Sequence, residues 1–226
     1  MKKTLIILWF ISCVLAGQAQ TLSLESDYLS VTIANAVPTA EFGRNDYLNA
    51  KHGSAKSGAM IGLEYIKSLN KYIGLGGSIG HRFNPYDKNK VIDTYRDNGI
   101  SLTEFSSATY RSTFFWASLL YKHHFNLKSN LYLKVNAGLA ANTFPEQSYK
   151  LNGLAVNSAE ATALAFASAL GVGYRYNLGK MALGIELIQM HTTPEFERKN
   201  SSGSDSEKVK KPMNTSNVTL TIGYKY

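Results

Sequence analysis

The sequence closes with Val218-Thr219-Leu220-Thr221-Ile222-Gly223-Tyr224-Lys225-Tyr226, in which apolar or aromatic residues alternate with small or polar ones. The apolar and aromatic positions are Val218, Leu220, Ile222, Tyr224 and Tyr226. A period of two indicates a β-strand, because successive side chains of a strand point to opposite faces. One apolar face, one polar face and an aromatic final residue are typical of the closing strand of a transmembrane β-barrel. We therefore expect the apolar side chains to point outward into lipid.

The rest of the sequence contains further alternating segments whose length suits membrane-spanning strands, about ten residues each. In the clearest of them, Leu131, Leu133 and Val135 alternate with Tyr132 and Lys134. The candidate strands lie at residues 27–37, 57–68, 71–83, 109–125, 130–142, 160–176, 180–191 and 215–226. Small single-chain bacterial barrels have an even number of strands. The predicted fold is all-β: an eight-stranded antiparallel up-and-down transmembrane β-barrel.

The segments between these candidate strands alternate in length. Residues 69–70, 126–129 and 177–179 are short and rich in Asn, Ser and Gly, which suits hairpin turns. Long polar segments follow the other strands, at residues 38–56, 84–108, 143–159 and 192–214. Short periplasmic turns and long extracellular loops are typical of outer-membrane barrels. The order in which short and long connections alternate along the chain places both termini on the periplasmic side.

The first 19 residues have the features of a cleaved secretory signal peptide. Lys2 and Lys3 precede an apolar stretch at residues 5–15, and the small residues Gly17 and Ala19 precede the predicted cut. The apolar stretch is too short for a spanning helix, which needs about 20 residues. We therefore expect a signal peptide at residues 1–19 and one barrel domain at residues 20–226, in the outer membrane of a Gram-negative bacterium.

Cys13 is the only cysteine, and it lies within the predicted signal peptide. A lipoprotein cut before Cys13 is an alternative, although Phe10 is bulky where such sites usually hold Leu. On the signal-peptide interpretation the mature chain has no disulfide, no thiol chemistry and no cysteine metal site.

The formal net charge is +8, which becomes +6 once Lys2 and Lys3 are removed. The basic residues are scattered, and the one dense run, Lys208, Lys210 and Lys211, lies in a long polar segment where a solvated loop is the simplest interpretation. Because an exported protein does not meet nucleic acid, none is expected as a partner. The expected partners are outer-membrane lipids, including anionic lipopolysaccharide.

The inward-facing positions of the candidate strands are mostly small or polar, as a narrow barrel interior requires. The same face carries six charged residues: Glu64, Lys122, Lys134, Arg175, Glu186 and Lys225. Charges enclosed in a narrow barrel must be paired or hydrogen-bonded. We therefore expect Glu64 and Glu186 to pair with some of Lys134, Arg175 and Lys225. Tyrosines near the strand ends, where they face outward, are expected to form girdles at the membrane interface.

Three segments together resemble bacterial outer-membrane β-barrels of the small porin-like family, similar in style to the outer-membrane protein A barrel domain. They are Gly17-Gln18-Ala19-Gln20, the glycine-rich segment Ile73-Gly74-Leu75-Gly76-Gly77-Ser78-Ile79-Gly80, and the closing strand at residues 218–226. The resemblance covers the chain after the signal peptide. It implies insertion by the barrel assembly machinery, which recognises a terminal strand of this kind. Tyr226 departs from the Phe that usually ends such barrels.

Residues that would carry chemistry are few, so we expect neither enzymatic activity nor a cofactor or metal. His123 and His124 are adjacent, and adjacent strand residues cannot both chelate one ion without a bulge. His81 and His191 lie near the outer strand ends, where a lipid A-modifying enzyme would place a histidine, but no nucleophile motif accompanies them.

The expected function is a structural or surface-interaction role through the long extracellular loops, around a packed polar lumen. A narrow pore for small solutes is the main alternative. A soluble lipocalin-like binder is disfavoured, since such barrels bury apolar residues inward and the inward set here is small and polar.

Overall fold

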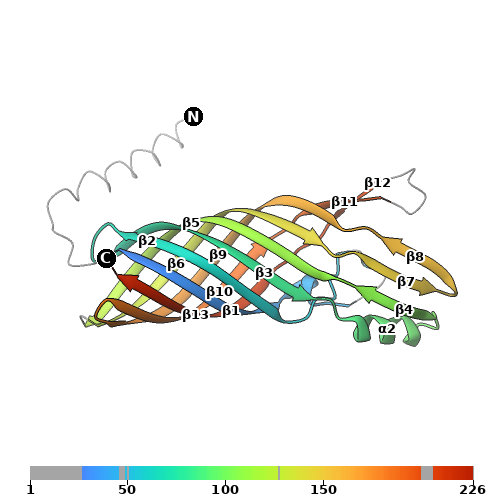
Figure 1. The fold of residues 1–226 in the computed structure, drawn as a ribbon, viewed down its shortest axis with the longest axis horizontal. Coiled ribbons are helices and arrows are strands. Elements are labelled where there is room, and N and C mark those ends of the chain that lie inside the picture. Colours follow the sequence, from blue (N-terminus) through green and yellow to red (C-terminus); the bar gives the residue numbers. More distant parts are fainter. Residues whose placement is uncertain (1–26, 46–48, 50, 127, 200–205, 226) are drawn as a thin grey trace.

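A computed structural model of the protein describes residues 27–45, 49, 51–126, 128–199 and 206–225. Eight of its strands close into a barrel in the spatial order β1-β13-β10-β9-β6-β5-β3-β2 (Figure 1). The barrel strands are β1 (Tyr28–Pro38), β2 (Gly58–Ser68), β3 (Ile73–Pro85), β5 (Thr109–Asn126), β6 (Ser129–Phe144), β9 (Ala161–Leu178), β10 (Met181–Thr192) and β13 (Thr215–Lys225). Every neighbouring pair is antiparallel, including β1 and β13, which close the barrel with Tyr28 opposite Lys225. The predicted fold class is confirmed.

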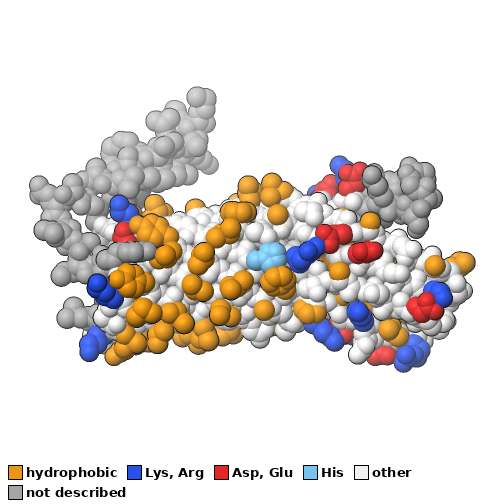
Figure 2. Space-filling model, in the orientation of Figure 1, with side chains coloured by type: hydrophobic (Ala, Val, Ile, Leu, Met, Phe, Trp, Pro, Cys, Tyr) orange, Lys and Arg blue, Asp and Glu red, His pale blue; other side chains and the backbone are white. Residues whose placement is uncertain are grey.

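The wall of the barrel is apolar on the outside. Along β6, Leu133 is 51% exposed and Val135 is 50% exposed, whereas Lys134 between them is 3% exposed. The same alternation runs through β13, whose Val218, Leu220, Ile222 and Tyr224 are exposed and whose intervening residues are buried. Figure 2 shows hydrophobic side chains covering the barrel wall, with charged side chains gathered at its two ends. Because an exposed apolar belt on a closed barrel is stable only in lipid, this is a transmembrane barrel.

A set of tyrosines rings the outside of the barrel at the end that carries the tight turns. Its members are Tyr65, Tyr72, Tyr121, Tyr174, Tyr176 and Tyr224, all exposed. This is the position that an amphipathic ring prefers, between acyl chains and headgroups. Tyr28, Tyr110 and Tyr132, in contrast, point into the lumen and are almost fully buried.

The long segments at the other end of the barrel are more ordered than the predicted loops. They form a short 3-10 helix η1 (Ala40–Phe42), a helix α2 (Lys88–Asp97), a three-stranded sheet and a two-stranded hairpin. The sheet contains β4 (Leu102–Ser107), β7 (Gln147–Leu151) and β8 (Leu154–Ser158), and the hairpin contains β11 (Glu195–Lys199) and β12 (Ser206–Lys210). Figure 1 shows these elements projecting from the end of the barrel opposite the carboxyl terminus. The sequence predicted these segments only as long loops and gave no sign of the pairing in them. Strand β4 pairs with β7 of the next long segment, whereas β7 with β8 and β11 with β12 pair within one segment, and this pairing satisfies backbone groups that lie beyond the barrel wall.

Helix α2 begins after Asp87, whose side chain accepts a hydrogen bond from the Lys90 amide as an N-terminal cap. In the part of the chain that the structure describes, no helix is long and apolar enough to cross a membrane. The predicted signal peptide at residues 1–19 lies outside the described residues and stays a prediction. Tyr226 also lies outside them, so its predicted place on the outward face of the closing strand stays a prediction too.

Candidate functional site

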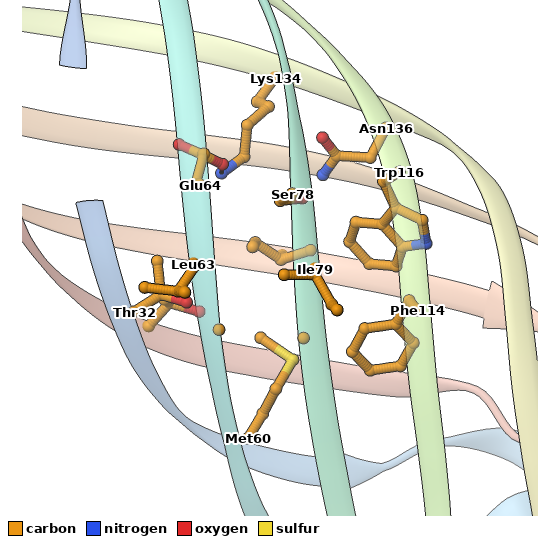
Figure 3. Close-up of a pocket in the computed structure, with 14 residues that line it drawn as sticks. Thr32, Met60, Leu63, Glu64, Ser78, Ile79, Phe114, Trp116, Lys134 and Asn136 are labelled. Atoms are coloured by element: carbon orange, nitrogen blue, oxygen red, sulfur yellow. Dashed lines mark hydrogen bonds and ion pairs between the residues drawn. The ribbon is translucent and has the colours of Figure 1, made fainter. Parts of the chain in front are cut away.

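The centre of the lumen holds a lysine between two carboxylates. Lys134 of β6 points into the barrel, where its Nζ donates hydrogen bonds to Glu64 Oε2 of β2 at 2.8 Å and to Glu186 Oε2 of β10 at 2.6 Å. The three side chains come from different parts of the wall and are at most 5% exposed. Figure 3 shows Lys134 and Glu64 meeting inside the barrel. These contacts tie three strands together across the lumen.

Two glycines in β9 make room for this arrangement. A Cβ at Gly171 would overlap the Glu186 carboxylate, and a Cβ at Gly173 would overlap the Tyr132 ring. The Tyr132 hydroxyl in turn donates a 3.3 Å hydrogen bond to Glu186 Oε2. The small inward residues of β9 thus leave space that large side chains from the neighbouring strands occupy, so they do not produce a hollow lumen.

The other three residues of the predicted charge network do not reach these carboxylates. Lys122 donates a 3.0 Å hydrogen bond to Ser68 Oγ near the tight-turn end. The Arg175 guanidinium lies over the rings of Tyr28 and Tyr132, at 4.4 and 5.0 Å from their centroids, and forms no ion pair with a described carboxylate. Lys225 Nζ lies 5.8 Å from the Tyr28 centroid. Arg175 and Lys225 are therefore held by cation–π contacts. The alternation of residues along a strand predicts which side chains face the lumen, but it does not predict which aromatic ring each of them contacts.

Large side chains fill the lumen from one end to the other. The inward face of β5 carries Lys122, Leu120, Ser118, Trp116, Phe114, Ser112 and Tyr110, all of which are buried. Arg82 of β3 crosses the barrel near its loop end and donates hydrogen bonds to Ser112 Oγ, Thr215 Oγ1 and the Met213 carbonyl at 3.0 to 3.1 Å. The sequence predicted mostly small inward-facing side chains, and the structure differs. Where the positions on one side of the lumen are glycine or alanine, large side chains from the facing strands are needed to fill an eight-stranded barrel.

An aromatic cluster closes the lumen at the loop end. It consists of the rings of Phe42, Tyr110, Phe144 and Phe196, against which Met213 packs, and each of these five side chains is at most 3% exposed. Phe144 makes edge contacts with the rings of Tyr110 and Phe196 at centroid distances of 5.5 and 5.7 Å. Phe42 and Phe196 come from segments predicted as loops, so alternation within the strands gave no signal for this cluster.

The free space left between these layers is small. A lumen cavity of about 30 Å³ adjoins Glu64, Trp116, Lys134 and Asn136 (Figure 3). A space of this size holds at most two or three water molecules, since each needs roughly 10–15 Å³. This cavity is therefore a small enclosed space beside the Lys134 ion pairs.

The histidines considered as catalytic candidates face outward and have few polar contacts. His81 Nδ1 lies 2.7 Å from Thr113 Oγ1, and His191 on β10 is the register partner of Ser168 on β9. Neither ring contacts a described carboxylate. His123 is exposed, and the adjacent His124 places Nε2 2.8 Å from the Lys71 carbonyl. No group of three or more metal-ligating side chains exists among the residues described.

Comparison with known proteins identifies the fold but no close relative. No family model matches the sequence, and no curated protein matches it. Among solved structures, the chain is similar to Neisserial surface protein A, with a TM-score of 0.51 and 12% identity over 88% of this chain and 97% of that one. It is also similar to a major outer membrane protein from Thermus thermophilus, with a TM-score of 0.52 and 13% identity over 89% of this chain and all of that one. The chain therefore has the fold of the small eight-stranded outer-membrane β-barrels.

Proposed function

We propose that the protein is an outer-membrane barrel of a Gram-negative bacterium that is closed to solutes and acts through the folded segments at its loop end. The barrel wall serves as the anchor, surrounded by lipid and lipopolysaccharide. The tight turns and both termini lie on the periplasmic side, and helix α2 with the small sheet and hairpin projects outward. Strand β13, with its aromatic alternation, is the segment that the barrel assembly machinery would recognise.

The filled lumen is the observation that carries this proposal. Lys134 bonded to Glu64 and Glu186 blocks the middle of the barrel, and the aromatic cluster around Phe144 blocks the loop end. A narrow pore would need a continuous polar path, and the lumen cavity beside Lys134 has only about 30 Å³. An anchor needs no such path, so the structure supports a role outside the lumen.

Single-channel recording in planar bilayers tests this proposal. The refolded full chain is first shown to be folded by its heat-modifiable gel migration, and a boiled sample serves as the control for detergent leakage. We expect no steady current above that control. A reproducible steady conductance from the folded sample would contradict the closed-barrel function and favour the narrow pore.

Modification of lipid is a second candidate function, and the cross-strand pair of His191 and Ser168 on the lipid-facing wall favours it. The pair lacks a carboxylate partner among the described residues, whereas a Ser–His nucleophile is normally oriented by a third group. We therefore propose that the protein is not an enzyme. Mass spectrometry of lipid A from cells with and without the protein should give identical species, and a mass change lost in a His191→Ala variant would establish the enzymatic alternative.

A further inference from the structure

The lipid-facing wall of the barrel carries a groove of about 630 Å³. The groove crosses five strands, from Val37 at the loop end of β1 to Leu133 on β6. Its exposed apolar side chains are Val37, Leu133, Leu170, Val172, Leu187 and Val218. The volume lies within the roughly 300–1,000 Å³ of sites that hold small molecules. The groove is therefore a hollow in a surface that lipid covers, and it is large enough to hold part of one lipid.

A small side chain in the wall produces the groove. Ser216 of β13 has Val37 and Gln189 as its register partners, and Leu170 lies beyond Gln189 in the same row. The next row toward the middle of the barrel consists of Val218, Leu187, Val172 and Leu133, each the register partner of the one before. Because serine is the smallest side chain in the first row, the wall is lower there than on either side.

Polar side chains line the edge of the groove nearest the loops. The Ser216 hydroxyl donates a hydrogen bond to Gln189 Oε1, and Gln189 Nε2 donates one to Thr39 Oγ1 at 3.3 Å. The bond to Thr39 uses one of the two hydrogens that an amide nitrogen carries. Two residues further along β10, His191 is exposed and lies opposite Ser168 of β9. This edge thus contains groups that donate hydrogen bonds and groups that accept them.

The polar edge lies inside the apolar belt. On the outer face of β9, Ser168 lies between Phe166 and Leu170, which are 65% and 60% exposed. Leu164, still closer to the loop end, is 67% exposed. Polar groups surrounded by hydrocarbon need hydrogen-bond partners, because no water reaches them there. A lipid suits this part of the wall best if it brings hydrogen-bonding groups to the depth of Ser168 and Gln189.

The shape of the groove favours a lipid over a second copy of the chain. In a two-fold contact the same patch of both copies meets, so two grooves would face each other. The space between them would stay unfilled, whereas protein interiors and contacts pack closely. A flexible acyl chain follows the groove instead, and the groove is continuous with the lipid-covered wall on every strand that it crosses.

We propose that this groove holds the lipid anchor of lipopolysaccharide at a fixed position on the barrel. One acyl chain would lie along Leu170 and Leu187. The hydroxyl and carbonyl groups near the head of the chains would bond to Gln189, Ser168 and His191. The chains of this lipid carry hydroxyl groups, which donate and accept hydrogen bonds, whereas the ester carbonyls of a phospholipid only accept them. The inference rests on the proposed function, because the loop end must face outward for the groove to lie in the leaflet that contains lipopolysaccharide.

Native mass spectrometry of the full chain in detergent micelles tests the proposal. The refolded protein is titrated with lipid A, the anchor of lipopolysaccharide, or with phosphatidic acid, which carries a phosphate but no hydroxyl groups on its chains. We expect one lipid A to stay bound to each barrel, roughly tenfold more tightly than phosphatidic acid. Equal affinities for the two lipids would overturn the proposal, as would a dimer of the chain that contains no lipid.

Filling the groove should displace the lipid. Ser216→Leu places a larger apolar side chain in the lowest part of the groove, so lipid A should bind roughly tenfold more weakly. Ala117→Leu is the matched control, because Ala117 is exposed on the outer face of β5 and does not line the groove. Undiminished binding of lipid A by Ser216→Leu, shown to be folded by heat-modifiable migration, would overturn the assignment to this groove.

Removing the polar edge tests the hydrogen bonds separately from the groove. The triple variant Gln189→Met, Ser168→Ala, His191→Leu keeps the apolar side chains of the groove, so the preference for lipid A over phosphatidic acid should disappear. Asn35→Met is the matched control, because Asn35 is an exposed amide on the outer face of β1 and does not line the groove. A tenfold preference that persists in the folded triple variant would contradict selection of the lipid by these hydrogen bonds.

The lipid titration and the bilayer recording keep the two proposals apart. A closed barrel that binds both lipids equally sinks the lipid site alone, whereas a conducting barrel sinks the closed-barrel function whatever the groove binds.

Discussion

The Nζ of Lys134 lies 2.6 Å from Oε2 of Glu186 in the centre of the barrel, where both side chains are at most 3% exposed. Glu64 approaches the same nitrogen from the other side at 2.8 Å. Two carboxylates therefore share one ammonium group in an enclosed space. Each of these charges loses its hydration when the barrel closes. Only close, well-aligned contacts between the ammonium group and the two carboxylates offset that loss.

Removing the lysine should destabilise the barrel strongly. In a Lys134→Met variant, Glu64 and Glu186 lose their shared cation and stay buried. Breaking a buried ion pair in this way costs roughly 3–5 kcal/mol. Urea unfolding in detergent micelles, followed by tryptophan fluorescence and gel migration, measures the loss. Lys128→Met, at an exposed turn position, is the control and should change little.

Neutralising the carboxylates as well should restore much of that loss. The triple variant Lys134→Met, Glu64→Gln, Glu186→Gln contains no unpaired charge, and replacing a whole buried network is often neutral. A triple variant as unstable as Lys134→Met alone would show that packing around the methionine, and not charge pairing, determines the effect.

Gly171→Ala tests whether β9 makes room for the carboxylate of Glu186. The added methyl group would overlap that carboxylate, so Glu186 must move away from Lys134. Overpacking of this kind typically costs about 1–3 kcal/mol. Gly184→Ala on the neighbouring strand is the matched control, because its Cβ would meet the Tyr174 carbonyl oxygen at an ordinary 3.4 Å. Equal unfolding midpoints for the two variants would argue against the close approach.

A charge on the outer wall should be costly only where lipid surrounds it. Leu133 is 51% exposed on β6, within the apolar belt. An arginine near the middle of the bilayer costs about 2–4 kcal/mol in barrels of this type. Leu133→Arg should therefore lower the folded fraction in lipid vesicles, whereas Ser106→Arg on the projecting β4 should not. If the Leu133→Arg variant folded as well as the parent chain, the result would indicate that this part of the wall faces water and not lipid.

The barrel itself was predictable from the sequence, because lipid and lumen impose different chemistry on alternate residues. Each of the eight predicted segments corresponds to an observed barrel strand, and the predicted 130–142 differs from β6 by only one or two residues at each end. The elements beyond the membrane were not predictable in this way. Strand β11 is only five residues long, and a short segment such as Glu195–Lys199 gives little periodic signal.

The lumen was predictable only in part. Alternation places Glu64, Lys134 and Glu186 on one face, but strand register and side-chain reach decide which charges meet. Arg175 shares that face and is held by the rings of Tyr28 and Tyr132 instead. The stacking of Phe105 on Tyr86 and Tyr149 depends on how α2, β4 and β7 pack together, which only the tertiary structure reveals. Aromatic residues within long polar segments are nevertheless a usable first signal of such packing.

Site-directed spin labelling along β6 tests the central claim most directly. Single cysteines at positions 131 to 136 are introduced into a chain whose own Cys13 is replaced by serine, and the labelled protein is placed in lipid vesicles. Labels at Leu131, Leu133 and Val135 should collide freely with oxygen, which concentrates in the acyl region, and rarely with a water-soluble nickel chelate. Labels at Tyr132, Lys134 and Asn136 should be immobile and shielded from both reagents. Accessibility without a period of two, or chelate contact at positions 131, 133 and 135, would contradict a lipid-facing wall around a packed lumen.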